Sequence, residues 1–224
     1  MLIGKKGIDF LHKSKVIVFG VGGVGSYAVE ALARAGIGEL VLVDFDIIDV
    51  TNINRQLPAL FSTIGKYKVD VLKQRIKDIN PLAQVNVYKT IVTPENVEAF
   101  FKESSTYVVD AIDSIKGKIA IIETALAREV PVISSMGVGN RLDPTKLKIG
   151  ALRETSGCPL ARIMRRELKK RGLAHNLKVV YSTELPMKTE GNSRSRSPGT
   201  ISFVPSVAGL LLAAYVVNDL LRFL

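Results

Sequence analysis

The sequence predicts an α/β protein with a Rossmann-like, largely parallel sheet flanked by helices, followed by a smaller C-terminal α+β portion. Two observations support this prediction. Apolar runs of strand length alternate with segments of helical periodicity through the first two thirds of the chain, which is typical of strand–helix–strand units. A glycine-rich turn at 20–25 joins the first strand to the first helix, as in sheets that bind nucleotides.

The apolar pattern places each expected element in order. Strands are predicted at 15–20, 40–44, 84–88, 106–110 and 130–134. Helices are predicted between them, at 24–36, 66–79, 94–102 and 115–128. Gly36 and Gly38 are well placed to end the first of these helices, and Pro81 prevents the second from continuing.

The pattern becomes less regular after Gly139. Strands are expected at 147–152 and 177–182, with helices at 160–170 and 210–221. Residues 183–200 lack a core pattern, so they predict a mobile surface loop. Segment 203–224 is the candidate for a membrane span, but Asn218 and Asp219 interrupt its apolar run. A buried helix is therefore favoured, and no stable membrane insertion is expected.

Composition narrows the class of protein. The chain has 224 residues with 47% hydrophobic content, which supports one packed domain or one domain with a small appendage. A formal net charge of +10 favours polyanionic partners such as nucleic acid. The single cysteine, Cys158, excludes an intrachain disulfide and a CxxC zinc pair. Because the first residues show no secretory signal pattern, we expect a cytoplasmic protein.

The glycine-rich turn indicates a phosphate site. Glycines at 20, 22, 23 and 25 allow a tight turn, and the helix that follows presents unpaired amides to an anion. Asp44 ends the next strand, where a carboxylate can accept hydrogen bonds from ribose hydroxyls. These features suit a nicotinamide cofactor as well as ATP. Taken alone, they leave a dehydrogenase as the favoured interpretation.

A charged segment at 44–56 separates the two possibilities. It places Arg55 just beyond the ribose-binding acid, and Lys68 and Asp113 follow. Binding of a nicotinamide cofactor does not require the cations Arg55 and Lys68 at these positions. Adenylation, in contrast, must neutralise charge on the α-phosphate while pyrophosphate leaves. The spacing therefore favours ATP and adenylation.

Four motifs resemble the pattern of the ubiquitin-activating superfamily. They are the GxGGxG turn at 20–25, the DxDxVxxxNxxRQ-like segment at 44–56, GxxK at 65–68 and an acid after a buried strand, Asp113. Within that superfamily the chain is similar to the ThiF-type tRNA threonylcarbamoyladenosine dehydratases over nearly its whole length. The stretches that carry this similarity are 110–114, 135–140, 142–145, 157–161 and 180–184.

The resemblance implies a role for each matching residue. Asp44 would bind the ribose, Asn52 and Arg55 the phosphates, and Lys68 the α- and β-phosphates. Asp113 would lie near the triphosphate or hold Mg²⁺, and Arg55, Lys68 and Asp113 are the expected catalytic residues. Asp46 and Asp49 also have a simpler interpretation as solvated or capping acids. The expected nucleotide-binding residues are Gly20, Gly22, Gly23, Gly25, Asp44, Asp46, Asn52, Arg55, Gln56, Lys68 and Asp113.

The resemblance also implies an activity, with ATP and Mg²⁺ as cofactors. It is the ATP-dependent dehydration, or cyclisation, of threonylcarbamoyladenosine in tRNA through a carboxyl adenylate, with release of pyrophosphate and AMP. Residues 1–140 would form the ATP-binding part and 141–224 the substrate-specificity part of one ThiF-type domain.

Two alternatives and several partners accompany this interpretation. The alternatives are an adenylyltransferase for a ubiquitin-like sulfur carrier, made less favourable by the absence of zinc cysteines, and a nicotinamide-binding dehydrogenase or non-catalytic nucleotide sensor.

A homodimer is expected, and a sulfur-transfer protein is a further candidate partner. Superfamily members often supply an N-terminal arginine across the dimer interface, but no arginine precedes Arg34 here. Either the chain is shortened at this end, or Lys5 or Lys6 replaces the arginine.

The C-terminal part offers a basic helix for tRNA. Five basic residues recur at helical spacing opposite an apolar stripe: Arg162, Arg165, Arg166, Lys169 and Lys170. The alternative is a solvated helix, but together with Lys188, Arg194 and Arg196 these residues favour a footprint for the tRNA backbone. Cys158 is interpreted as a structural residue rather than a nucleophile, since the dehydratase chemistry needs no thioester.

Overall fold

The computed structural model describes residues 2–101, 105–173, 176–187 and 198–222. A seven-stranded sheet with the order β3-β2-β1-β4-β5-β7-β6 forms its centre. Every neighbouring pair is parallel except β6 with β7, which confirms the predicted fold class. The strands are β1 Lys15–Phe19, β2 Glu39–Val43, β3 Gln84–Tyr88, β4 Tyr107–Asp110, β5 Val132–Ser135, β6 Leu147–Ala151 and β7 Lys178–Ser182.

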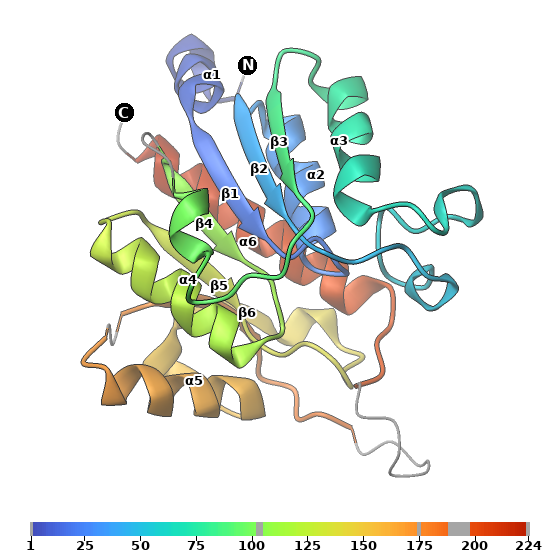
Figure 1. Cartoon of the computed structure of the whole chain (residues 1–224). Coiled ribbons are helices and arrows are strands. Elements are labelled where there is room, and N and C mark those ends of the chain that lie inside the picture. Colours follow the sequence, from blue (N-terminus) through green and yellow to red (C-terminus); the bar gives the residue numbers. More distant parts are fainter. Residues whose placement is uncertain (1, 102–104, 174–175, 188–197, 223–224) are drawn as a thin grey trace.

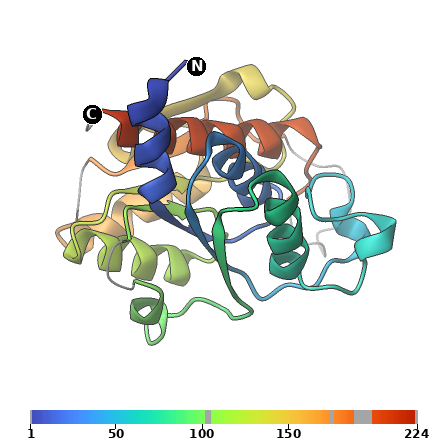
Figure 2. The same cartoon turned by 90° about the horizontal axis from the view of Figure 1, so that it is seen from above.

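Helices cover both faces of the sheet (Figure 1). Successive side chains of β1 belong alternately to two apolar clusters, one packed on α1, α2, α3 and α6 and the other on α4 and α5. Figure 2 shows the sheet between α6 and α4. A parallel sheet buried on both faces accounts for the nearly continuous apolar runs of its strands. The helices are α1 Gly4–Lys13, α2 Gly25–Ala35, α3 Lys68–Ile79, α4 Ile115–Ala127, α5 Pro159–Lys170 and α6 Phe203–Leu221.

Single 3₁₀ turns connect several of these elements. One of them, η3, replaces most of the helix predicted at 94–102, whose last residue lies outside the described part. The Asn96 side chain accepts a hydrogen bond from the Thr93 amide at 2.9 Å, so this segment begins as a capped turn, and Phe100 and Phe101 then pack against Phe19. The turns are η1 Val50–Asn52, η2 Phe61–Thr63, η3 Val97–Phe100, η4 Pro144–Lys146 and η5 Leu152–Glu154.

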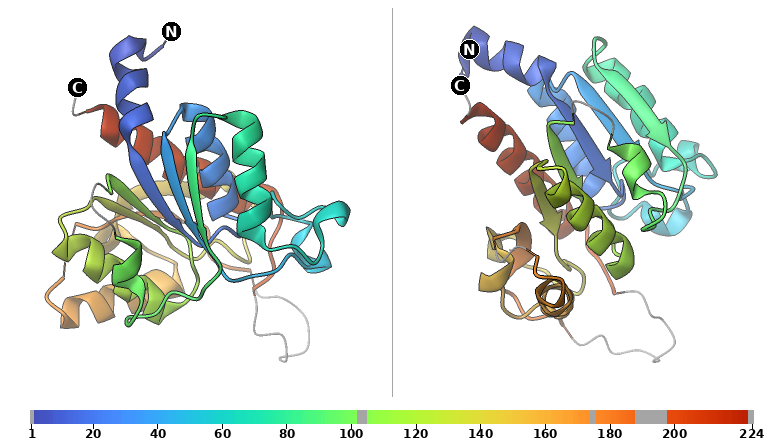
Figure 3. Two further views of the ribbon diagram at one scale, coloured as in Figure 1. Left: turned by 45° about the horizontal axis from the view of Figure 1, so that its top comes forward. Right: turned by 60° about the vertical axis from the view of Figure 1, so that its left-hand side comes forward.

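Two helices differ from the sequence prediction. Helix α1 was not predicted, and it lies beside the end of α6 (Figure 3), where a Cβ on Gly7 would be 3.3 Å from Leu221 Cδ2. Helix α6 begins at Phe203 rather than at residue 210. A Cβ on Gly209 would lie 2.2 Å from the Val24 carbonyl oxygen. This glycine therefore lets α6 approach α2 closely and does not end the helix.

Helix α6 is long and apolar enough to cross a membrane by length and composition. In the structure, however, its apolar face packs into the core at intervals of three and four residues. This arrangement agrees with the prediction of a buried helix. The buried residues of α6 are Val204, Pro205, Ala208, Gly209, Leu212, Ala213, Val216 and Leu220.

Candidate functional site

The glycine turn between β1 and α2 is built by close backbone packing. Gly20 has φ +81°, and a Cβ there would lie 2.9 Å from the carbonyl carbon of Ala111. A Cβ on Gly25 would lie 1.8 Å from the carbonyl oxygen of Gly20. The turn therefore requires glycine at both positions, and it directs the N-terminus of α2 toward the carboxyl ends of the strands.

A cavity of about 510 Å³ lies in front of this turn. It is formed at the carboxyl ends of the parallel strands, where ligands bind in open α/β sheets. All the predicted nucleotide-binding residues except Gly25 line it: Gly20, Gly22, Gly23, Asp44, Asp46, Asn52, Arg55, Gln56, Lys68 and Asp113. Segments that are up to 93 positions apart in the sequence thus share one cavity.

Part of the cavity wall was not predicted. Residues 90–92, after β3, and Ile112, after β4, could have been inferred, because the carboxyl ends of parallel strands meet at one edge. Val138, Thr200 and Pro205 also line the cavity. Their positions depend on how the C-terminal part folds back over the sheet, for which the sequence carries no local signal.

Asp44 links the turn to the second strand. Its carboxylate accepts hydrogen bonds from the Val21 amide at 2.7 Å and the Asp46 amide at 2.8 Å. Burial raises the pKa of Asp44 above its usual range, and this effect outweighs the two amide hydrogen bonds, which lower it. The carboxylate is therefore fixed in position at the cavity wall, with little access to bulk water.

Lys68 and Asp46 form an ion pair at the start of α3. The Lys68 Nζ atom lies 2.5 Å from Asp46 Oδ2, and the exposed side-chain fractions are 4% and 43%, respectively. Asp46 is thus more than a solvated acid. Asp49 does cap a turn, as the simpler interpretation states: its side chain accepts the Thr51 amide at the start of η1.

Arg55 and Gln56 line the cavity beside the glycine turn. The Arg55 guanidinium donates to the Thr51 carbonyl at 2.8 Å and to Asn54 Oδ1 at 2.9 Å, and it forms no ion pair with a carboxylate among the described residues. Gln56 is 8% exposed, and its Oε1 atom is buried without a hydrogen-bond partner in the described part of the chain. The Arg55 guanidinium, whose partners are neutral, is available to pair with an anionic ligand. The unpaired Gln56 Oε1 atom can accept a hydrogen bond from a polar ligand.

Asp113 follows β4 at the N-terminus of α4. The next residue, Ser114, caps that helix by accepting the Gly117 amide at 3.3 Å. The described residues contain no group of three or more His, Cys, Asp or Glu side chains that could hold a metal ion. Since Mg²⁺ commonly uses one or two carboxylates together with substrate phosphates, Asp113 suits such a site only when phosphate oxygens supply the remaining ligands.

The basic residues of the predicted helix, α5, differ in their interactions. Arg165 turns inward and donates to the Thr155 carbonyl at 2.6 Å. Arg166 and Lys170 pair with Glu167, whereas Arg162 and Lys169 are exposed. Cys158 is buried at the start of this helix, as expected for a structural residue. Lys188, Arg194 and Arg196, with the rest of the predicted loop from 188 to 197, lie outside the described residues.

The fold and the cavity define a Rossmann-like nucleotide-binding protein. The sequence model of the ThiF family matches residues 1–223, and the chain belongs to this family. It is similar to the tRNA threonylcarbamoyladenosine dehydratase of Bacillus subtilis (strain 168), with 45% identity over 99% of this chain and 92% of that relative.

Two solved structures of the Escherichia coli dehydratase have nearly the same fold. One is a complex with AMP and the other a complex with ATP. Each has a TM-score of 0.92 and 34% sequence identity, and the match covers 99% of this chain in both. It covers 92% of the AMP-bound chain and 91% of the ATP-bound chain.

Proposed function

We propose that this chain is an ATP-dependent tRNA threonylcarbamoyladenosine dehydratase. The observation that carries the proposal is the cavity, where a glycine turn, a ribose-type acid and two cations meet on a chain that is 45% identical to a dehydratase. ATP is the nucleotide that a homologous structure holds. The cavity volume of about 510 Å³ is within the ordinary range for small-molecule sites.

The reaction has two steps. In the first, the threonyl carboxylate of the modified nucleoside attacks the α-phosphorus of ATP, an O–P bond forms, and pyrophosphate leaves. In the second, an atom of the threonylcarbamoyl group attacks the acyl carbon, the ring closes, and AMP leaves with the electron pair of the broken C–O bond. The nucleoside loses the elements of water, and the cleavage of ATP drives that loss.

Four polar residues of the cavity have proposed roles in the first step. Asp44 accepts hydrogen bonds from the ribose hydroxyls. Lys68 leaves Asp46 for the α- and β-phosphates, which becomes favourable when a more highly charged partner enters. Asn52 and Arg55 bind phosphate oxygens, and the planar guanidinium can form two parallel hydrogen bonds to them. These cations stabilise the negative charge that develops as pyrophosphate leaves.

Mg²⁺ is proposed as a companion of ATP. Asp113 would hold the ion together with phosphate oxygens, and the ion would neutralise charge on the leaving pyrophosphate. The residues of the chain bind and orient the nucleotide around it.

The partners and location are further proposals. tRNA would bind through the exposed members of the basic set, Arg162, Arg166, Lys169 and Lys170, whereas Arg165 supports the helix from inside. A homodimer, a sulfur-transfer protein as partner and a cytoplasmic location are proposed from the resemblance. Residues 141–224 are proposed as the part that selects the substrate.

Pyrophosphate and AMP release tests the proposed function. Wild-type protein and Arg55→Ala would be incubated with ATP and threonylcarbamoylated tRNA, unmodified tRNA or a ubiquitin-like carrier protein. We expect release only with the modified tRNA and its loss in the variant. Release with the carrier would favour the sulfur-carrier adenylyltransferase, and no release with any of the three would contradict both enzymes.

A further inference from the structure

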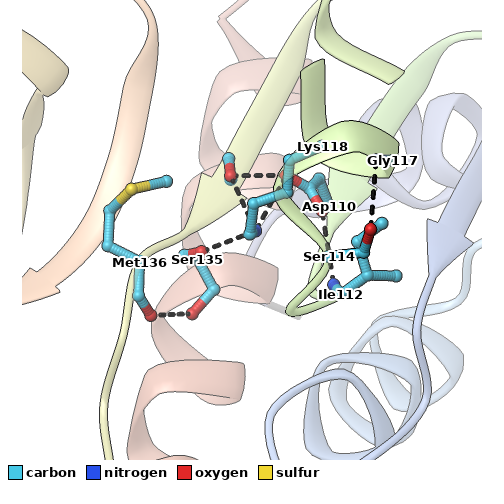
Figure 4. A network of polar contacts seen from close by, with 8 residues as sticks. Asp110, Ile112, Ser114, Gly117, Lys118, Ser135 and Met136 are labelled. Atoms are coloured by element: carbon cyan, nitrogen blue, oxygen red, sulfur yellow. Dashed lines mark hydrogen bonds and ion pairs between the residues drawn. The ribbon is translucent and has the colours of Figure 1, made fainter. Parts of the chain in front are cut away.

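A fully buried ion pair lies next to the segment 111–114, which lines the cavity (Figure 4). Lys118 on α4 and Asp110 at the end of β4 both have side chains with 0% exposure, and Nζ lies 3.0 Å from Oδ2. Lys118 Nζ also donates to Ser134 Oγ at 3.2 Å and to the Ser135 carbonyl at 2.8 Å. Three acceptors thus satisfy the three donors of the ammonium group.

Stability alone gives little reason for such a pair. Replacement of a buried ion pair by apolar residues of similar volume is often neutral or stabilising, because two charges must be taken out of water. A pair with every donor matched is better explained by the need for one defined geometry. The defined geometry therefore has to fix some other part of the molecule.

The contacts of Asp110 show that this part is the segment after β4. Its Oδ2 atom also accepts the Ser134 hydroxyl at 2.6 Å, which ties the ends of β4 and β5 together. Its Oδ1 atom accepts the Ile112 amide at 3.3 Å. Ile112 immediately precedes Asp113, and the segment 111–114 forms one wall of the cavity. The other wall is close, since a Cβ on Gly20 would lie 2.8 Å from Ile112 Cγ2.

We propose that Lys118 is a positioning residue for adenylation, acting through Asp110 to fix the segment 111–114 and hence Asp113 at the nucleotide. The inference rests on the proposed function for its catalytic consequence. Lys118 touches no ligand, because it lies wholly behind the wall. Its effect reaches the reaction through the Ile112 amide, which donates to Asp110.

A double substitution separates this role from a purely structural one. Lys118→Met alone leaves Asp110 as an unpaired buried charge and can prevent folding. Asp110→Asn combined with Lys118→Met removes both charges and keeps the volumes similar, so the protein should fold with a thermal midpoint close to that of the wild type. Lys15→Met is the matched control, because the Lys15–Glu39 pair, with an N–O distance of 3.0 Å, lies at the opposite ends of the strands.

Two measurements apply to each variant. Hydrogen exchange followed by mass spectrometry reports on 111–114 without any substrate, and pyrophosphate release at saturating ATP reports on adenylation. In the double variant we expect faster exchange at 111–114, an ATP dissociation constant that changes by a smaller factor than the rate, and a rate lower by about 10- to 100-fold, as for a small misplacement in an active site. Lys15→Met should change neither the exchange at 111–114 nor the rate.

The outcomes are distinct. Normal protection of 111–114 in the double variant, or a rate that recovers together with thermal stability, would overturn the positioning role. If the wild-type protein releases no pyrophosphate, the proposed function fails. The exchange at 111–114 still decides whether Lys118 fixes this wall.

Discussion

Two lysine–aspartate pairs at the carboxyl ends of the strands differ in their access to solvent. In the pair Lys68–Asp46 the carboxylate is 43% exposed, whereas both members of Lys118–Asp110 are fully buried. Water can replace Lys68 as the partner of Asp46, but it cannot reach Asp110. The first lysine is thus free to exchange its carboxylate for a phosphate, while the second is confined to the scaffold.

This difference separates two uses of the same chemistry. An ion pair with one hydrated member holds a cation beside the cavity and can be broken with little loss of folding free energy, because a solvent-accessible pair contributes little to stability. A fully enclosed pair defines a geometry and becomes costly when one partner is removed. Substitutions at Lys118, Lys68, Asp44 and Arg75 test this distinction.

The largest expected effect is on the enclosed pair. Lys118→Met should lower the free energy of unfolding by about 3–5 kcal/mol, because it leaves a buried carboxylate without a counter-ion. Urea unfolding followed by circular dichroism measures the loss. A loss no greater than that of Lys15→Met would show that Asp110 finds water or another partner, and the contrast between the pairs would disappear.

The pair Lys68–Asp46, with its partly exposed carboxylate, should lose more activity and less stability. We expect Lys68→Met to lower pyrophosphate release by about 100- to 1000-fold, the usual cost of removing a group that stabilises transition-state charge. Its free energy of unfolding should change less than that of Lys118→Met, since Asp46 can be hydrated. Lys66→Met, two residues away and exposed, is the matched control and should keep the wild-type rate. Equal losses of stability at positions 68 and 118 would contradict the distinction.

Asp44 lies between these extremes, because it is buried but faces the ligand. Asp44→Asn should weaken ATP binding by about 1.5–3 kcal/mol, the value of hydrogen bonds to a charged group. Burial raises the pKa of Asp44, so acidification should protonate the wild-type carboxylate at a higher pH than it would an ordinary aspartate. ATP affinity should therefore fall more steeply below neutral pH in the wild type than in the variant. Calorimetric titrations at several pH values give both slopes, and parallel slopes would show that Asp44 does not contact the ligand.

The same raised pKa affects the protein without ATP. Above it, ionised Asp44 lowers the free energy of unfolding relative to the protonated form. The contribution of this residue to stability should therefore improve as the pH falls through that pKa.

The smallest effect is expected at a surface pair between α2 and α3. Arg75 donates to Glu30 at 2.7 Å and 2.9 Å. Partial burial raises the pKa of Glu30, but hydrogen bonds from Arg75 and Arg34 outweigh this effect and lower it. Arg75→Ala should cost about 0.2–1 kcal/mol of unfolding free energy. The cost should be present above the unfolded pKa of Glu30 and vanish as the pH falls through its lowered folded pKa. A cost of several kcal/mol would place this pair with Lys118–Asp110.

Much of this arrangement could be predicted from the sequence because it depends on local signals. The glycines of the turn, the apolar strands and the charged segment 44–56 each follow a strand end, and parallel strands bring those ends to one edge. Helix α1 and the short turn η3 were harder, because their formation depends on packing against α6 and Phe19. The wall residues Val138 and Thr200 depend on the path of the returning chain.

Lys118 shows a different limit of sequence-based inference. A lysine is almost never fully buried unless it is paired, so the segment 115–127 gave no reason to place it inside. Asp110 was recognised as part of a motif at the end of its strand, but its partner could be found only from the packing of α4 against β5.

Helix α6 has a consequence for how the protein is made. Pro205 lines the nucleotide cavity, and a Cβ on Gly23 in the turn would lie 3.3 Å from its Cβ atom. The glycine turn is therefore translated long before Pro205, its neighbour in the folded structure. A nascent chain that has already folded its first strands still has an open cavity, and the apolar face of α2 remains uncovered. Nucleotide binding should thus begin only after α6 has docked.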